Sequence, residues 1–204
     1  MSQPVEAVVF DVGRVLVQWD LRFLFGKLIA DPARLEWFVT TVVTPEWHFQ
    51  HDAGRPLDEM IPERIAQFPE CAHLIQAYRQ RFCESIPGPI PGSIELAEAL
   101  AGRGVALFAI TNFGAEFWPP FRAEWPVFDL FTDIVVSGDE RIAKPDPAIY
   151  ALAALRFGYA PAAMLFIDDN AENIAAAREC GWQVHHFTDA NTLEADLRER
   201  SLLG

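Results

Sequence analysis

The segment that most constrains the fold of this chain is residues 8–16, Val-Val-Phe-Asp-Val-Gly-Arg-Val-Leu. An apolar run ends there at a carboxylate, and a glycine turn follows. Such a run is typical of a strand that is buried on both faces of a parallel sheet. We expect Asp11 to close that strand at its carboxyl end, where open α/β sheets usually bind their ligands. The segment therefore predicts an α/β fold with a polar site at one edge of the sheet.

Further apolar runs alternate with helical patterns along the rest of the chain. Strands are expected at residues 5–10, 105–110, 133–136, 164–167 and 183–187. Strands that alternate with helices form a parallel sheet with right-handed crossovers. The sequence therefore predicts a Rossmann-like, three-layer α/β core.

One long segment interrupts this alternation and shows helical spacing alone. Within it, Thr44-Pro45 looks like a helix N-cap followed by proline at the first helical position. Proline and glycine crowd residues 86–92, which cannot continue a helix and mark a boundary. We expect a small cap domain of four or five helices, inserted after the first strand. The expected boundaries are residues 1–18 and 86–204 for the core and residues 19–85 for the cap.

Polar residues stand directly after three of the expected strands. Asp11 closes the first, Thr111 and Asn112 follow the second, and Asp168 and Asp169 follow the strand at 164–167. Because the carboxyl ends of parallel strands share one edge, these groups should meet there. Each pair alone is readily explained as a turn or a helix cap. Three carboxylates together repel one another without a cation, and hard oxygen ligands with open positions suit Mg²⁺.

This constellation predicts phosphoryl transfer. Asp11 would attack phosphorus and carry a transient aspartyl-phosphate, while Mg²⁺ stabilises the developing charge. The Thr111 hydroxyl and the N–H groups of Asn112 would hold the other phosphoryl oxygens. Lys144, at the start of an expected helix, would neutralise charge on the transferred group and hold the carboxylates in place. A solvated surface position is the alternative for this lysine.

Taken in order, four stretches of the chain resemble the haloacid dehalogenase superfamily of hydrolases, whose members are mostly phosphatases. They read Phe-Asp-Val-Gly-x-Val-Leu, Thr-Asn-Phe, Lys-Pro-Asp-Pro-x-Ile-Tyr and Phe-Ile-Asp-Asp-Asn-x-x-Asn-Ile. The combination is most similar to the branch that contains sugar-1-phosphate phosphatases and the N-terminal domain of soluble epoxide hydrolase. The helical insertion resembles the C1-type cap of subfamily I, which closes over the site.

The resemblance also implies a metal site and a substrate class. The ligands of Mg²⁺ would be the Asp11 side chain, the backbone carbonyl of Gly13 and Asp169, with Asp168 adjacent to them. The substrate would be a small phosphorylated metabolite, such as a sugar phosphate.

One position departs from the family pattern. Phosphatases of the family usually carry an aspartate, the general acid, two residues after the nucleophile, where this chain has Gly13. General acid help is worth about 10²–10⁴-fold and matters least for good leaving groups. We therefore expect either slow phosphatase activity or a substrate with a good leaving group, such as an anomeric sugar phosphate or an acyl phosphate. Alternatively, a residue of the cap supplies the proton; His48, His51 and Asp52 are the candidates. Arg14, His48 and His51 are also candidate substrate contacts. Arg14 could instead pair with the acids, and the two histidines could simply occupy surface or helix positions without a role.

The composition narrows the partners. A formal net charge of −13 argues against a general affinity for nucleic acid or anionic membranes. No apolar run approaches the roughly 18 residues of a membrane span, and the N-terminus lacks a signal-peptide pattern. The three widely spaced cysteines form neither a disulfide framework nor a metal knuckle. We expect a cytoplasmic monomer or homodimer. The aromatic stretch at residues 113–125 could pack in the core, form a lid over the site or, if several of its rings are exposed, mediate dimerisation.

Two other functions stay open. One is a 2-haloacid dehalogenase, whose leaving halide needs no proton, so that the absence of an acid at Gly13 would do no harm. Against it, metal-free dehalogenases carry neutral Ser and Asn at the positions of Asp168 and Asp169. A non-catalytic binding or regulatory protein of the same fold is favoured only by Gly13. Phosphate release with Mg²⁺, chloride release without metal, or ligand binding without turnover distinguishes the three functions.

Overall fold

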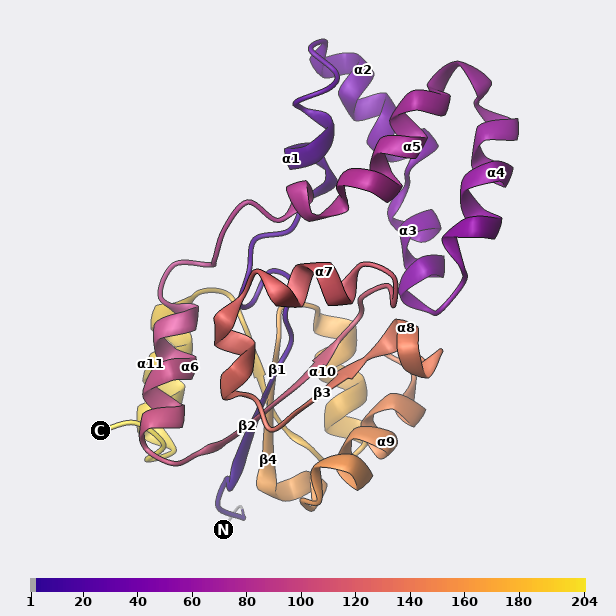
Figure 1. Ribbon diagram of the computed structural model, residues 1–204. Helices are drawn as coiled ribbons and strands as arrows, with labels where there is room; N and C mark the ends of the chain where they lie inside the picture. Colours follow the sequence, from indigo (N-terminus) through magenta and orange to yellow (C-terminus); the bar gives the residue numbers. More distant parts are fainter. Residues whose placement is uncertain (1–2) are drawn as a thin grey trace.

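Five parallel strands form one sheet in the order β3-β2-β1-β4-β5 (Figure 1). The computed structural model describes residues 3–204. The strands are β1 (Ala7–Phe10), β2 (Ala106–Thr111), β3 (Asp133–Val136), β4 (Met164–Asp168) and β5 (Gln183–His186). β1 pairs with both β2 and β4 and is the central strand. Every expected strand is present, and the predicted α/β fold with a parallel sheet is confirmed.

Helices cover both faces of the sheet and give the core three layers. One face carries α6 (Ser93–Gly102), α7 (Trp118–Ala123) and α11 (Ala190–Glu199), and the other carries α9 (Pro147–Phe157) and α10 (Ala171–Glu179); the short α8 (Ser137–Glu140) follows β3. Val8 and Phe10 of β1 join the apolar core beneath α6 and α11, whereas Ala7 and Val9 join the core beneath α9 and α10. Since both faces of β1 are buried, its continuous apolar run is explained.

A helical insertion between β1 and α6 lies over the carboxyl edge of the sheet (Figure 1). Its helices are α1 (Leu21–Phe25), α2 (Pro32–Trp37), α3 (Pro45–Asp52), α4 (Leu57–Gln67) and α5 (Ala72–Arg81). Thr44 caps α3 as expected, because its hydroxyl accepts a hydrogen bond from the N–H of Trp47. The chain enters and leaves the insertion side by side, since the Gln18 N–H donates to the Gly88 carbonyl at 2.9 Å.

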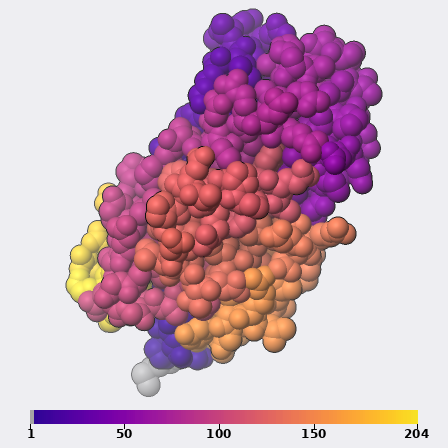
Figure 2. All heavy atoms as spheres, viewed as in Figure 1, coloured from indigo at the N-terminus to yellow at the C-terminus, as the bar shows by residue number. Residues whose placement is uncertain are grey.

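The insertion meets the core where a glycine leaves room for it. A Cβ atom on Gly114 would lie 2.0 Å from Cδ2 of His51, so only glycine allows this approach. The Ser137 hydroxyl donates to the carbonyl of Asp52, the last residue of α3. On the face seen in Figure 2, the insertion is stacked directly on the segment around residue 120. The end of α3 is therefore fixed to the core.

The aromatic stretch after β2 belongs to the core. Phe113, Phe117, Trp118 and Phe121 are buried, and Phe117 stacks on Phe82 with a ring-centroid distance of 4.0 Å. The interpretation of this stretch as core packing is therefore correct for these four side chains. The three cysteines are free, and among the helices of residues 3–204 none is long and apolar enough to cross a membrane.

Candidate active site

Asp11 lies directly after β1, at the carboxyl end of the central strand. Its backbone N–H donates to the carbonyl of Ile167 in β4 at 2.8 Å, which extends the sheet pairing by one residue. The side chain is 11% exposed. Asp11 therefore stands at the position that the apolar run predicts, with its backbone held by the neighbouring strand.

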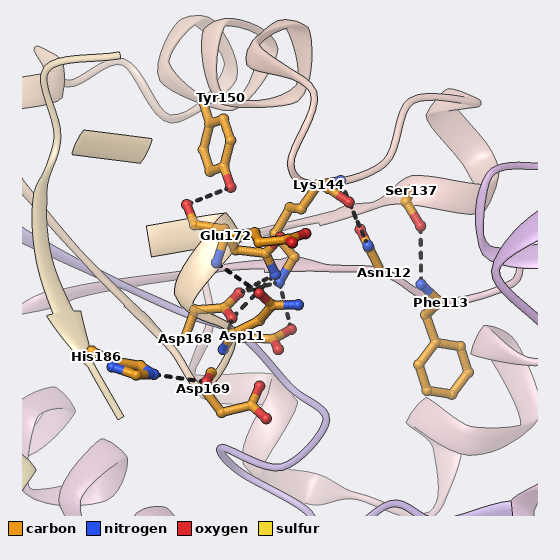
Figure 3. Close-up of polar contacts among 12 residues, drawn as sticks. Asp11, Asn112, Phe113, Ser137, Lys144, Tyr150, Asp168, Asp169, Glu172 and His186 are labelled. Atoms are coloured by element: carbon orange, nitrogen blue, oxygen red, sulfur yellow. Dashed lines mark hydrogen bonds and ion pairs between the residues drawn. The ribbon is translucent and has the colours of Figure 1, made fainter. Parts of the chain in front are cut away.

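Lys144 is at the centre of the polar cluster (Figure 3). Its Nζ lies 2.8 Å from Oδ1 of Asp11 and 2.7 Å from Oδ2 of Asp168, and its side chain is fully buried. Burial lowers the pKa of Lys144, but the two ion pairs outweigh burial and the net shift is upward, so the ammonium stays charged. A solvated surface position for this lysine is wrong.

Asn112 holds the backbone of Lys144 through two hydrogen bonds. Its Nδ2 donates to the Lys144 carbonyl and its Oδ1 accepts from the Lys144 N–H, both at 2.9 Å. The Asn112 side chain therefore positions the lysine, a role that its place after a strand did not predict. Thr111 closes β2, and its hydroxyl has no hydrogen-bond partner in residues 3–204. Of the three residues expected to hold phosphate, Asn112 and Lys144 line the cavity described below, and Thr111 is not among its lining residues.

Asp168 is completely buried, and protein donors occupy both of its oxygens. Besides Lys144, the N–H of Asn170 donates to Oδ1 at 2.8 Å. Nδ2 of Asn173 donates to both oxygens at 3.1 and 3.0 Å, and the Tyr150 hydroxyl donates to the Asn173 carbonyl at 2.9 Å. Asp168 therefore orients Lys144. Asn173 belongs to the fourth stretch quoted from the sequence, Phe-Ile-Asp-Asp-Asn-x-x-Asn-Ile, but no role was predicted for it.

Three carboxylates gather beside this lysine. One oxygen each of Asp11, Asp168 and Asp169 lie within 4.8 Å of one another, and His186 donates to the Asp169 backbone carbonyl at 2.9 Å. Burial raises the pKa of Asp11 to about 7, against the opposing charge of Lys144, and burial also raises the pKa of Asp169. Because one ammonium does not balance three carboxylates, the cluster favours a cation. A donor set made only of oxygens fits Mg²⁺.

The cluster opens into a cavity of about 170 Å³ between the core and the insertion. Its apolar lining consists of Val17, Trp19, Phe82, Ile86 and Phe113. Gly13 and Arg14 line it beside Asp11. Arg14 has a φ of 61°, in the left-handed region, and its guanidinium carbon lies 4.9 Å from the Trp19 ring centroid. Arg14 is therefore placed where it can contact a substrate.

Two residues of α3, His48 and Asp52, line the same cavity. Nδ1 of His48 lies 2.7 Å from the Tyr78 hydroxyl, and Nε2 lies 3.2 Å from Oδ2 of Asp52. The imidazole is stacked on Trp19 and on Phe82, with centroid distances of 4.9 and 5.5 Å. Burial lowers the pKa of His48 to about 3. His48 is therefore a neutral imidazole, locked in place by its neighbours.

His51 faces the contact between insertion and core. Nδ1 donates to the Arg55 carbonyl at 2.9 Å, and the ring packs edge-on against Phe117 at 4.7 Å. Among residues 3–204, the side chains that line the cavity include His48 and Asp52 but not His51. Of the three α3 residues considered as proton donors or substrate contacts, His51 is the one that the structure places elsewhere.

The sheet order, the helical insertion after the first strand and the lysine–carboxylate cluster define a class of Rossmann-like enzymes that work at the end of that strand. A family model described as haloacid dehalogenase-like hydrolase matches residues 5–181. The chain belongs to this family. The resemblance inferred from the four motifs is confirmed at this level.

Curated relatives of similar length are phosphatases. The chain is 27% identical over 205 residues to the sesquiterpene phosphatase astK of Aspergillus oryzae, and the match covers 98% of each chain. It is also 27% identical over 190 residues to a phosphoglycolate phosphatase of Thiobacillus denitrificans, covering 89% of this chain and 82% of the relative. The names of these two relatives refer to chemically different substrates.

Solved structures share the fold. The family enzyme bt-2542 of Bacteroides thetaiotaomicron has a TM-score of 0.73 and 18% identity, with 92% of this chain and 95% of that chain covered. That enzyme has also been solved in complex with magnesium and inorganic phosphate. At this identity the likeness shows the fold alone.

Proposed function

We propose that this chain is a Mg²⁺-dependent phosphatase that hydrolyses a small phosphomonoester through an aspartyl-phosphate on Asp11. The observation that carries the proposal is the buried Lys144, held between Asp11 and Asp168 at the sheet edge where three carboxylates meet. Membership of the hydrolase family supports it, as do the two curated relatives, which are phosphatases.

Asp11 is the nucleophile in this proposal. Lys144 holds one of its oxygens, and Asp168 in turn holds Lys144, so the carboxylate presents its other oxygen in a fixed direction. That oxygen bonds to phosphorus as the bond from phosphorus to the alcohol oxygen breaks. Water then attacks phosphorus and releases Asp11. The Lys144 ammonium compensates the charge that collects on the transferred group.

The groups that we assign to Mg²⁺ are the carboxylates of Asp11 and Asp169 and the carbonyl of Gly13. Asp168 adjoins them, but its oxygens are already occupied by protein donors. When bound, the ion supplies positive charge that relieves the repulsion among the carboxylates and polarises the phosphoryl group.

The helical insertion acts as a cap in this proposal. We assign residues 19–85 to a cap domain and residues 1–18 and 86–204 to the catalytic core. In support, α3 contributes His48 and Asp52 to the lining of the cavity that holds Asp11. An insertion at this point of the chain also supports a place among the family members with a C1-type cap.

We infer that the alcohol part of the substrate is largely apolar. Trp19, Phe82 and Ile86 line the cavity, and both ring nitrogens of His48 already have partners. Asn112 and Asn173 also have partners within the protein. Apart from Arg14 and Asn170, few polar groups of the lining are therefore left to bind the hydroxyls of a sugar. A terpenoid phosphate, as implied for the Aspergillus oryzae relative by its name, suits this lining better than the sugar phosphate expected from the motifs.

A 2-haloacid dehalogenase is the weaker alternative. Its carboxylate substrate would approach three acidic side chains, with one lysine to compensate them. A purely structural role for the cluster is also disfavoured, because uncompensated buried charge is costly to keep.

The test measures phosphate release from a prenyl phosphate, a sugar 1-phosphate and phosphoglycolate, with Mg²⁺ and with a chelator. We expect release that needs both Mg²⁺ and Asp11, fastest with the prenyl ester, and none from Asp11→Asn. Chloride release from 2-chloropropionate without phosphate release would assign the dehalogenase function instead. A clear preference for the sugar ester would refute the apolar substrate class.

A further inference from the structure

Cleavage of an ordinary phosphomonoester requires a proton at the leaving oxygen, because an alkoxide is a poor leaving group. The cavity-lining side chains that can carry a proton are Asp11, Arg14, His48, Asp52, Lys144 and Asp169. Asp11 is the nucleophile of the proposed function, and Asp169 is assigned to the metal. Lys144 is shared between two carboxylates, and a guanidinium such as that of Arg14 does not give up its proton in proteins.

His48 is not suited to be the donor either. Both of its ring nitrogens have partners, one in Tyr78 and one in Asp52. Burial lowers the pKa of His48 to about 3, so the imidazole carries no surplus proton near neutral pH. Among the groups that line the cavity, Asp52 is left.

We propose that Asp52, supplied by the insertion, is the general acid and general base of this hydrolase, in place of the side chain that Gly13 lacks. This rests on the proposed function. In the first step the Asp52 carboxyl gives its proton to the alcohol oxygen as the bond from that oxygen to phosphorus breaks. In the second step the Asp52 carboxylate takes a proton from the water that attacks phosphorus, and the bond between Asp11 and phosphorus breaks. One proton leaves Asp52 and one returns in each turnover.

The hydrogen bonds around Asp52 leave one oxygen for this role. The residue is 5% exposed. Oδ2 lies 3.2 Å from Nε2 of His48, while Oδ1 is sealed from solvent and has no hydrogen-bond partner of normal geometry in residues 3–204. A neutral imidazole has one donor and one acceptor nitrogen. If the Tyr78 hydroxyl donates to Nδ1, the Nε2–H donates to Oδ2, and the carboxyl proton resides on Oδ1. Because Oδ1 is buried, the proposal includes a turn of the carboxyl group about its Cβ–Cγ bond, which brings the proton to the alcohol oxygen.

The surroundings of Asp52 favour its protonated form. Burial raises the pKa of Asp52 well above its ordinary value; the nearby N–H of Gly114 and the charge of Lys144 oppose the rise, and the charge of Asp11 adds to it. The fields of Asp11 and Lys144 reach Asp52 because all three line one cavity. These surroundings favour a protonated carboxyl group in the cavity that also holds the nucleophile.

The core fixes the position of Asp52, although the residue belongs to the insertion. The Ser137 hydroxyl donates to the Asp52 carbonyl and accepts a hydrogen bond from the N–H of Phe113 at 3.0 Å. Ser137 follows β3 and Phe113 lies two residues beyond β2. The donor is thus tied to the same sheet edge that carries the nucleophile.

The decisive variant is Asp52→Asn in the full-length protein with Mg²⁺, compared on two substrates. One is an alkyl phosphate, whose leaving group needs a proton, and the other is 4-nitrophenyl phosphate, whose leaving group does not. We expect kcat/KM, which reports the steps through formation of the aspartyl-phosphate, to fall by about 10²–10⁴-fold on the alkyl ester and by far less on the aryl ester. The matched control is Asp58→Asn, since Asp58 is an exposed carboxylate of the same insertion; it should leave both rates unchanged.

A second measurement does not depend on turnover. The infrared spectrum of the wild type near neutral pH should contain a carboxylic acid C=O band that is missing from Asp52→Asn, and the absence of that band refutes the proposal. Equal loss of kcat/KM on both substrates, or no loss on either, also overturns the acid–base role. A wild type that hydrolyses no phosphomonoester overturns the proposed function and this role with it. An active wild type whose Asp52→Asn variant shows no selective loss overturns this role alone.

Discussion

The buried, neutral His48 makes a quantitative prediction about acid stability. The folded chain holds this imidazole at a pKa of about 3, whereas the unfolded chain has the ordinary value of 6.5. Between these values the unfolded chain binds more protons, so stability is fully present above pH 6.5 and falls as the pH drops. Each pH unit costs about 1.4 kcal/mol, and at about pH 4.5 the His48 contribution is a loss of about 2.7 kcal/mol.

The assay is urea unfolding of the full-length protein at several pH values, for the wild type and His48→Gln. The amide cannot be protonated in this range, so the stability difference between the two proteins should shrink by about 2.7 kcal/mol between about pH 7 and 4.5. Other titrating groups are present in both proteins and largely cancel. His73→Gln is the matched control, because His73 is exposed, and its pH curve should parallel that of the wild type.

The result that would refute this reasoning is a constant difference between the wild type and His48→Gln across the pH range. The imidazole would then be charged in the folded state, in spite of its burial and its place between Trp19 and Phe82. A charged His48 would in turn imply an ionised Asp52 at 3.2 Å, which cannot donate a proton.

Three further predictions concern the core. Asp11→Asn should reduce phosphate release by more than about 10⁴-fold, as loss of a nucleophile does, while its unfolding midpoint remains at or above that of the wild type, because one of three crowded carboxylates is removed. Lys144→Met should lower the free energy of unfolding, measured with urea, by about 3–5 kcal/mol, since it leaves the Asp168 carboxylate buried without its ion-pair partner. The double variant with Asp168→Asn should recover part of this loss. If the effects of the two single substitutions simply add, the ion pair does not contribute. Mg²⁺ at a hundredfold excess over its Kd should stabilise the wild type by about 2.7 kcal/mol, or roughly 5–10 °C in Tm, and an unchanged Tm would argue against the metal site.

The sequence was most informative about groups that the sheet itself positions. The apolar runs ending at Asp11 and Asp168 predict strands, and parallel strands bring their carboxyl ends together whatever the length of chain between them. The carboxylates separated by more than a hundred residues in sequence therefore meet within 4.8 Å. Lys144 could be assigned to the same edge because three acids there require a counter-charge.

Side-chain partners were harder to predict, because they depend on tertiary packing. Asn112 was expected to face a phosphate, yet its side-chain amide is used to hold the Lys144 backbone. His48 and His51 are three residues apart on α3, a spacing that puts both on neighbouring parts of one helix face. His48 nevertheless lines the cavity and His51 is pressed against Gly114. Their surroundings differ because α3 is docked on the core in one particular orientation. The spacing of residues in the sequence does not specify that orientation.

That docking also explains how an inserted helix can take part in chemistry at the sheet edge. A proton donor must lie within hydrogen-bond reach of the reacting oxygen, and small displacements from a productive geometry lower the reaction rate strongly. α3 spans only eight residues and is fixed at both ends, by the Thr44 cap at its start and by Ser137 at Asp52. The side chains of one short helix therefore line the substrate cavity and supply a carboxyl group, so changes in α3 should alter substrate selectivity and proton transfer together.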